Sequence, residues 1–129
     1  MGFRVYDNEQ KKWIKDNIYL SPDDGLFLIK QSLFGMVKVP LALDSDRYIY
    51  HRDIGLYDKD GITVYEGDYI YARVAEDKEE IGLVAYAAEL SAYIILCVDS
   101  DTFYTLGSNV SEEISVIGNV FDGYEKQRN

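Results

Sequence analysis

The run Asp58-Lys59-Asp60-Gly61 constrains the fold of this chain more than any other part of the sequence. An Asp at the first position of a turn accepts backbone N–H groups, and a Gly at the last position tolerates a positive φ. The flanking segments, Gly55–Tyr57 and Ile62–Tyr65, are aliphatic, β-branched and aromatic. The pattern therefore predicts a β-hairpin or a wide β-turn in the middle of the chain.

A second reversal follows at Glu66-Gly67-Asp68, where Gly67 suits a backbone position with positive φ. It leads into the segment Tyr69–Val74, in which apolar and polar or aromatic residues alternate. A period of two residues is typical of a strand with one buried face. The two reversals thus predict a set of strands that fold back on one another.

The rest of the chain also favours strands over helices, since it holds twelve Tyr and only two Pro. We expect an all-β fold with few short helical turns, such as one at 87–90. Charge balance changes near residue 50, which divides the 129 residues into an N-terminal β subdomain (1–50) and a C-terminal subdomain (51–129). Within the last predicted strand, Gly118 and Asn119 are expected to form a β-bulge.

Four blocks of sequence carry a family resemblance. The central stretch Gly55–Ile70 reads G-L-x-D-x-x-G-x-x-x-Y-E-G-D-x-I, and the chain opens with Phe3–Asp7 in the form F-R-x-Y-D. A G-x-V-x-Y pattern starts at Gly82, and the last block, Val116–Asp122, reads V-I-G-N-V-F-D. Together these blocks resemble the YopX family of phage and prophage proteins, with Asp122 where the family pattern has Glu; residues 16–50 match none of its blocks.

The resemblance implies a β-rich fold in which an N-terminal β unit packs on a C-terminal part similar to a small SH3-like barrel. It implies no established activity, and it transfers no catalytic residue to this chain.

Charge is distributed unevenly along the sequence. Residues 1–50 hold seven basic and seven acidic side chains, whereas residues 51–129 hold six basic and sixteen acidic ones and so carry the whole net charge of −10. An acidic surface repels phosphate, so nucleic-acid binding by this half is unfavourable, whereas a basic protein partner would be attracted. The alternative is nucleic-acid binding through the basic residues of the first predicted hairpin: Arg4, Lys11, Lys12 and Lys15.

The sequence indicates a cytoplasmic protein of a bacterial host. It has one Cys, and no segment shows the pattern of a secretion signal. Its apolar runs are much shorter than the roughly 20 residues that a membrane span needs. The Cys, Cys97, lies in an apolar strand and is expected to be an inert core residue.

Carboxylates recur two residues apart, a spacing that places both on one face of a strand. Such pairs can bind a divalent metal or act as acid and base, and a small metal-dependent enzyme is the alternative function that they support. Turns favour Asp for structural reasons, and an EF-hand alignment on Gly61 puts Leu56 and Gly67 at ligand positions, so we assign no metal or cofactor. The pairs are Asp44/Asp46, Asp58/Asp60, Glu66/Asp68 and Asp99/Asp101.

No complete catalytic constellation is present in the sequence. His51, the only His, is followed by Asp53, which could orient it as a base. A single His near a strand end is more often an ordinary half-buried residue. Trp13, the only Trp, is expected to anchor the N-terminal core, with a role as an exposed ligand platform as the alternative.

Tyrosines gather around the central stretch and predict an exposed aromatic face of the kind that binds peptides in SH3-like barrels. Tyrosines that simply cover a sheet are the competing interpretation. The predicted interaction surface consists of Tyr65, Glu66, Asp68, Tyr69, Tyr71 and Tyr86.

Taken together, these features predict a non-enzymatic accessory protein of phage or prophage origin. It would act by contacting another protein, of the host or the phage, or further copies of itself. In a sharper form of this hypothesis, the acidic half competes for the basic surface of a DNA-binding protein.

Overall fold

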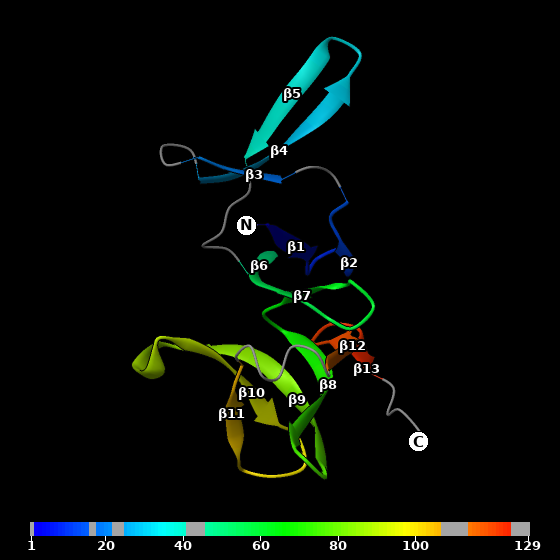
Figure 1. Cartoon of the computed structure of the whole chain (residues 1–129). Coiled ribbons are helices and arrows are strands. Elements are labelled where there is room, and N and C mark those ends of the chain that lie inside the picture. Colours follow the sequence, from blue (N-terminus) through cyan, green and yellow to red (C-terminus); the bar gives the residue numbers. More distant parts are fainter. Residues whose placement is uncertain (1, 16–17, 22–24, 41–45, 107–113, 125–129) are drawn as a thin grey trace. The chain divides into compact units, whose positions relative to one another are not determined.

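The prediction of an all-β chain is confirmed. The computed structural model describes residues 2–15, 18–21, 25–40, 46–106 and 114–124, and in these ranges one short 3₁₀ turn, η1 (Ala88–Leu90), accompanies the strands (Figure 1). The chain divides into two compact units, Gly2–Arg52 and Asp53–Asn129. Strand β6 (Tyr48–Tyr57) belongs to both units, because its first half pairs with β1 and its second half with β7.

The N-terminal unit contains a short antiparallel ladder and a three-stranded antiparallel sheet. In the ladder, β1 (Phe3–Asp7) pairs with both β2 (Lys12–Trp13) and β6. The sheet has the order β3-β4-β5, and its strands are β3 (Ile18–Ser21), β4 (Gly25–Ser32) and β5 (Gly35–Pro40).

A buried carboxylate organises the turn between β1 and β2. Asp7 is 4% exposed, and its Oδ1 accepts the amides of Glu9 and Gln10 at 3.0 and 3.2 Å. The Arg47 guanidinium donates to both Asp7 oxygens, at 3.2 and 3.1 Å, which lowers the pKa of this carboxyl below its usual value. The same side chain therefore holds the turn and joins it to the segment that leads into β6.

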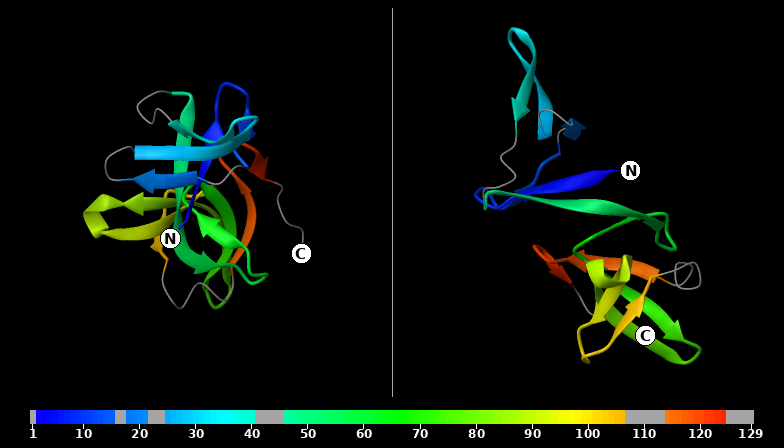
Figure 2. Two further views of the ribbon diagram at one scale, coloured as in Figure 1. Left: turned by 90° about the horizontal axis from the view of Figure 1, so that it is seen from above. Right: turned by 90° about the vertical axis from the view of Figure 1, so that its left-hand side faces the viewer.

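The C-terminal unit is built on a six-stranded antiparallel sheet with the order β11-β10-β9-β8-β12-β13. The sheet curls into a half-barrel, at the place where a small SH3-like barrel was expected (Figure 2). Strand β7 (Thr63–Tyr65) lies next to β6 in the other ladder. The six strands are β8 (Asp68–Ala75), β9 (Lys78–Ala87), β10 (Ala92–Cys97), β11 (Phe103–Thr105), β12 (Ile114–Asn119) and β13 (Gly123–Tyr124).

One face of the curled sheet carries the core. Side chains from β7, β8, β9, β10 and β12 are almost completely removed from solvent there, and Ile54 and Leu56 from β6 pack against them. Burial of each large aliphatic side chain stabilises the fold by about 1.5–3 kcal/mol. The core residues are Val64, Ile70, Ala72, Val84, Ile95 and Ile114.

The predicted turn at 58–61 is present, and the carboxylate of Asp58 holds it together. Asp58 is 6% exposed, and its Oδ1 accepts the amides of Asp60 and Ile62 at 2.8 and 2.9 Å. Its Oδ2 accepts the amide of Val116 in β12 at 3.0 Å. One side chain thus closes a local turn and connects it to a strand that is 58 residues away in the sequence.

The bulge expected at Gly118 is confirmed, and it has a steric reason. The register between β12 and β8 shifts between Val116 and Gly118. A Cβ atom added to Gly118 would lie 2.7 Å from the Cβ of Tyr124 and closer still to the Gly123 carbonyl oxygen. Only glycine allows β13 to fold back onto β12 at this point.

Replacing Asp58 tests how much its carboxylate contributes to the stability of the fold. Asp58→Ala removes three charge-assisted hydrogen bonds and leaves three amides without that acceptor, so we expect the free energy of unfolding to fall by about 3 kcal/mol or more. Urea denaturation followed by far-UV circular dichroism measures the change. Asp60→Ala is the matched control, because Asp60 is exposed in the same turn, and it should change stability by less than about 0.5 kcal/mol. Equal effects of the two substitutions would contradict this role for Asp58.

Candidate functional site

The six residues of the predicted interaction surface do not form one surface. Tyr69 and Tyr71 alternate along β8 with the buried Ile70 and Ala72, so their side chains leave the sheet on the face opposite the core. Tyr71 donates a hydrogen bond to Glu79 on the same face. Asp68 is 1% exposed and accepts the Tyr65 amide at 2.8 Å, so its carboxylate has a structural role and presents no charge to a partner.

The remaining three residues of that prediction lie elsewhere. Tyr65 and Glu66 are half-buried where β7 ends. Tyr86 is 49% exposed, but it is paired in register with Tyr93, and both lie on the same side of their strands as the core residues Val84 and Ile95. The two rings meet edge to face, with centroids 5.2 Å apart.

A row of apolar side chains crosses the whole six-stranded sheet on the face opposite the core. The register pairs Phe103 with Leu96, Leu96 with Leu83, and Leu83 with Tyr69. Tyr69 is in turn opposite Gly118, which is opposite Tyr124. Residues that pair directly across strands point to the same face. We call Phe103, Leu96, Leu83, Tyr69 and Tyr124 the apolar row.

The apolar row is partly open to solvent. Phe103 is 51% exposed, Leu96 is 42% exposed and Tyr124 is 38% exposed, whereas Leu83 and Tyr69 are half-buried. The Tyr69 and Tyr124 rings contact each other across the position of Gly118, with centroids 4.6 Å apart. Large contiguous apolar patches often mark surfaces that bind other molecules, so the row is a candidate for such a surface.

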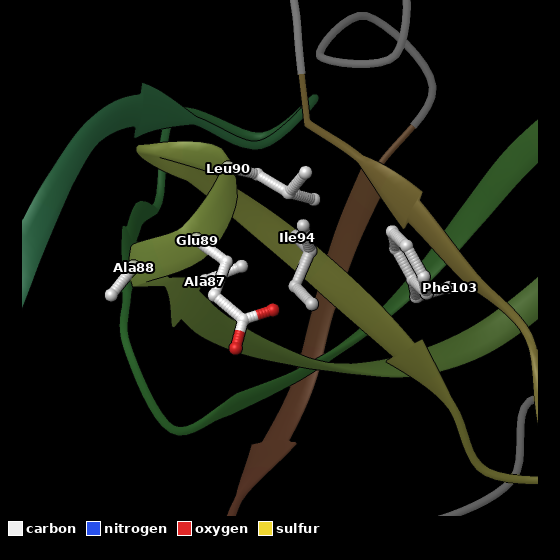
Figure 3. A pocket seen from close by; sticks show the side chains of 6 residues that line it. All are labelled: Ala87, Ala88, Glu89, Leu90, Ile94 and Phe103. Carbon is white, nitrogen blue, oxygen red and sulfur yellow. The ribbon is translucent and has the colours of Figure 1, made fainter.

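An open hollow adjoins the row at Phe103. It has a volume of about 390 Å³ and is lined by residues of β9, η1, β10 and β11. Figure 3 shows the side chains of Leu90, Ile94 and Phe103 around it, with the Glu89 carboxylate nearby. The apolar row and this hollow together make up the candidate site, and we call the face that carries them the outer face.

The outer face belongs to a strongly acidic unit. Residues 53–129 contain five basic and sixteen acidic side chains. Beyond the row, Arg73 and Glu79 pair across β8 and β9 at 3.7 Å, and both are partly exposed. An apolar surface within an acidic unit suits a partner that has apolar anchors and basic neighbours.

The structure assigns structural roles to two members of the predicted carboxylate pairs. Asp58 and Asp68 accept backbone amides as described above, and Lys59 follows Asp58 on the surface of the turn. Asn119 acts similarly, since its Oδ1 accepts the amides of Phe121 and Asp122. Within the described residues, no group of three or more His, Cys, Asp or Glu side chains is arranged to hold a metal ion. Asp44 lies outside those residues.

His51 lies beside aromatic and cationic groups of the N-terminal unit. Its Nδ1 is 3.4 Å from an Arg4 guanidinium nitrogen, and its ring centroid is 5.9 Å from that of Trp13. Trp13 is half-buried and contacts Tyr6 edge to face at 5.1 Å, while Arg4 covers its ring at 4.4 Å. Burial, followed by the charge of Arg4, lowers the pKa of His51 from 6.5 to about 4. Asp53, the predicted orienting acid, accepts the Gly55 amide at 2.7 Å.

The other basic residues of the first hairpin lie at its surface. Lys11 and Lys12 are exposed at the turn and in β2, and Lys15 is exposed just after β2. Lys11 Nζ donates to Asn8 Oδ1 at 2.7 Å. Cys97 is 7% exposed, in the apolar surroundings that the sequence predicted. Among the described residues, no helix is long and apolar enough to span a membrane.

These features describe an all-β protein of two compact units, with an exposed apolar site on the acidic one. The chain belongs to the YopX family. The family model, described as YopX protein, matches residues 2–125. Among solved structures, it is similar to the crystal structure of protein EF1440 from Enterococcus faecalis, with 21% sequence identity over 92% of both chains and a TM-score of 0.51. That likeness supports the fold. No curated protein matches the chain.

The pKa of His51 predicts how the stability of the N-terminal unit depends on pH. Because the pKa of about 4 in the folded state lies below the ordinary 6.5, the unfolded chain binds the proton first. Stability should therefore fall as the pH drops from 6.5 to about 4, and the contribution of His51 should be constant below that. Urea unfolding monitored by the fluorescence of Trp13, the only Trp, reports on this unit.

In the variant His51→Gln, the free energy of unfolding should no longer show the fall that His51 causes as the pH drops from 6.5. The comparison is made between pH 6.5 and about 5, because Asp7 contributes to the pH dependence only near and below its ordinary pKa of 3.8. An unchanged slope in the variant would show that another group controls the pH dependence.

Proposed function

We propose that the protein is a non-enzymatic phage or prophage accessory protein that works by contacting another protein in the cytoplasm of a bacterial host. The observation that carries the proposal is the apolar row, which crosses six strands while the opposite face of the same sheet holds the core. An antiparallel sheet with its core on one face commonly presents polar side chains on the other, so a partly exposed apolar row there favours a role in binding.

The composition of the row supports a protein partner. Tyr and Phe are enriched in the buried centres of protein interfaces, where they supply large contact areas. The acidic residues of the same unit would attract a basic partner and accelerate its approach. A DNA-binding protein has a basic surface of the required kind, so competition for such a surface is the specific form of the proposal.

Two substitutions in the row provide the test. Leu96→Ser and Tyr124→Ser remove exposed side chains at two separate points of the row, and neither residue lines the hollow. The tagged protein is incubated with nuclease-treated lysate of the bacterial host, and retained proteins are identified by mass spectrometry after washes at low and then moderate salt. We expect one stoichiometric partner with the wild type and at least tenfold less of it with the double variant, as removal of interface anchors typically causes.

The matched control is Tyr57→Ser, which removes a tyrosine that is 65% exposed in β6 and lies outside the row. It should retain the partner fully. Loss of the partner on raising the salt would show that charge contributes to binding, since screening weakens exposed charge interactions. Equal recovery with the double variant, or recovery of no partner by the wild type, would contradict docking through the row.

A further inference from the structure

A second exposed apolar feature lies in the N-terminal unit, at the tip of the hairpin formed by β4 and β5. Ser32 pairs with Gly35, so Leu33 and Phe34 are the two residues of the connecting turn. Both are 99% exposed, and Met36 next to them is 65% exposed. Turns of this kind normally carry Gly, Asn, Asp or Ser. Here Gly35, with a φ of +112°, allows the reversal, and two large apolar residues occupy the tip.

The tip has basic neighbours. The segment 29–38 contains Lys30 and Lys38 and no acidic residue. Lys38 is exposed, and its Nζ lies 4.5 Å from the centre of the Phe27 ring. The hairpin therefore combines two apolar anchors at its tip with lysines in its strands, and an acidic unit with an exposed apolar surface would attract both.

The hollow on the outer face matches this tip in size and charge. A cavity of about 150 Å³ admits a benzene molecule, so an open hollow of about 390 Å³ has room for the ring of Phe34 and for Leu33 beside it. Leu90, Ile94 and Phe103 provide an apolar lining, and Glu89 adds an acidic group to it, which favours a hairpin that carries lysines and no acidic residue.

We infer that the hairpin tip of one copy of this chain docks in the hollow of a second copy, with Leu33 and Phe34 as anchors. This inference rests on the proposed function, since it names a second copy as an occupant of the outer face. The contact joins two different surfaces, so each dimer still has one unused tip and one unused hollow. Such head-to-tail contacts produce rings or chains that grow with protein concentration.

Sedimentation velocity over a series of concentrations tests the inference on the full chain. The wild type should show a weight-average sedimentation coefficient that rises with concentration and falls when salt is added. The tip variant Leu33→Ser/Phe34→Ser and the hollow variant Leu90→Ser/Phe103→Ser should each raise the dissociation constant for self-association by about tenfold or more. All four positions are more than half exposed, and Tyr57→Ser is again the control that should behave as the wild type.

A mixture of the two variants gives the sharpest result. The hollow variant still has an intact tip, and the tip variant still has an intact hollow, so equal amounts should form a one-to-one dimer that does not grow further. A wild type that stays monomeric, association that persists in the tip variant, or a mixture that forms no dimer would each overturn the inference. None of these outcomes tests binding of the host partner, which is probed separately by the substitutions of Leu96 and Tyr124.

Discussion

The hydrogen bonds of the buried Asp58 carboxylate are the interaction on which the C-terminal unit depends. They satisfy two amides of the turn at 58–62 and one amide of β12, and so fix where a distant strand joins the sheet. Burial acts to raise the pKa of Asp58, but the amides of Val116, Ile62 and Asp60 lower it below the usual value, so the group stays charged and keeps its acceptors. Asp7 has the corresponding role in the N-terminal unit, with Arg47 as its distant partner.

With the strands fixed in this way, the two faces of the curled sheet have different roles. The core on one face is close-packed and accounts for folding. The outer face keeps aromatic and aliphatic side chains of five strands partly in water, and an apolar hollow adjoins them beside η1 and Ile94 of β10. Under the proposed function, the charge of the unit would favour basic partners, and the apolar row and hollow would supply the contact area.

The sequence allowed the fold to be predicted well because its strongest signals are local. Asp58, Gly61 and Gly67 mark turns, and alternation along Tyr69–Val74 marks a strand. The site was harder to predict, because the row depends on register between strands that are far apart in the sequence. Tyr69 was identified from its own strand, whereas Leu83, Leu96, Phe103 and Tyr124 join it only through pairing. Asp68 was wrongly placed on the surface, because alternation does not reveal that its carboxylate serves the Tyr65 amide.

The family blocks contain residues that hold the fold together. Asp7, Asp58, Asp68 and Gly118 all fall within them, and each holds a turn or allows a close approach of strands. Tyr69 and Leu83 occupy unspecified positions of the blocks, and Leu96, Phe103 and the hairpin tip lie outside them, so the proposed contacts involve positions that the blocks do not define. The most direct test of this account is hydroxyl-radical footprinting of the free protein and of the protein in its partner complex. Protection of Phe103, Leu96 and Tyr124, with Tyr57 and Ile62 unchanged, is the predicted result; unchanged oxidation along the row would contradict docking on the outer face.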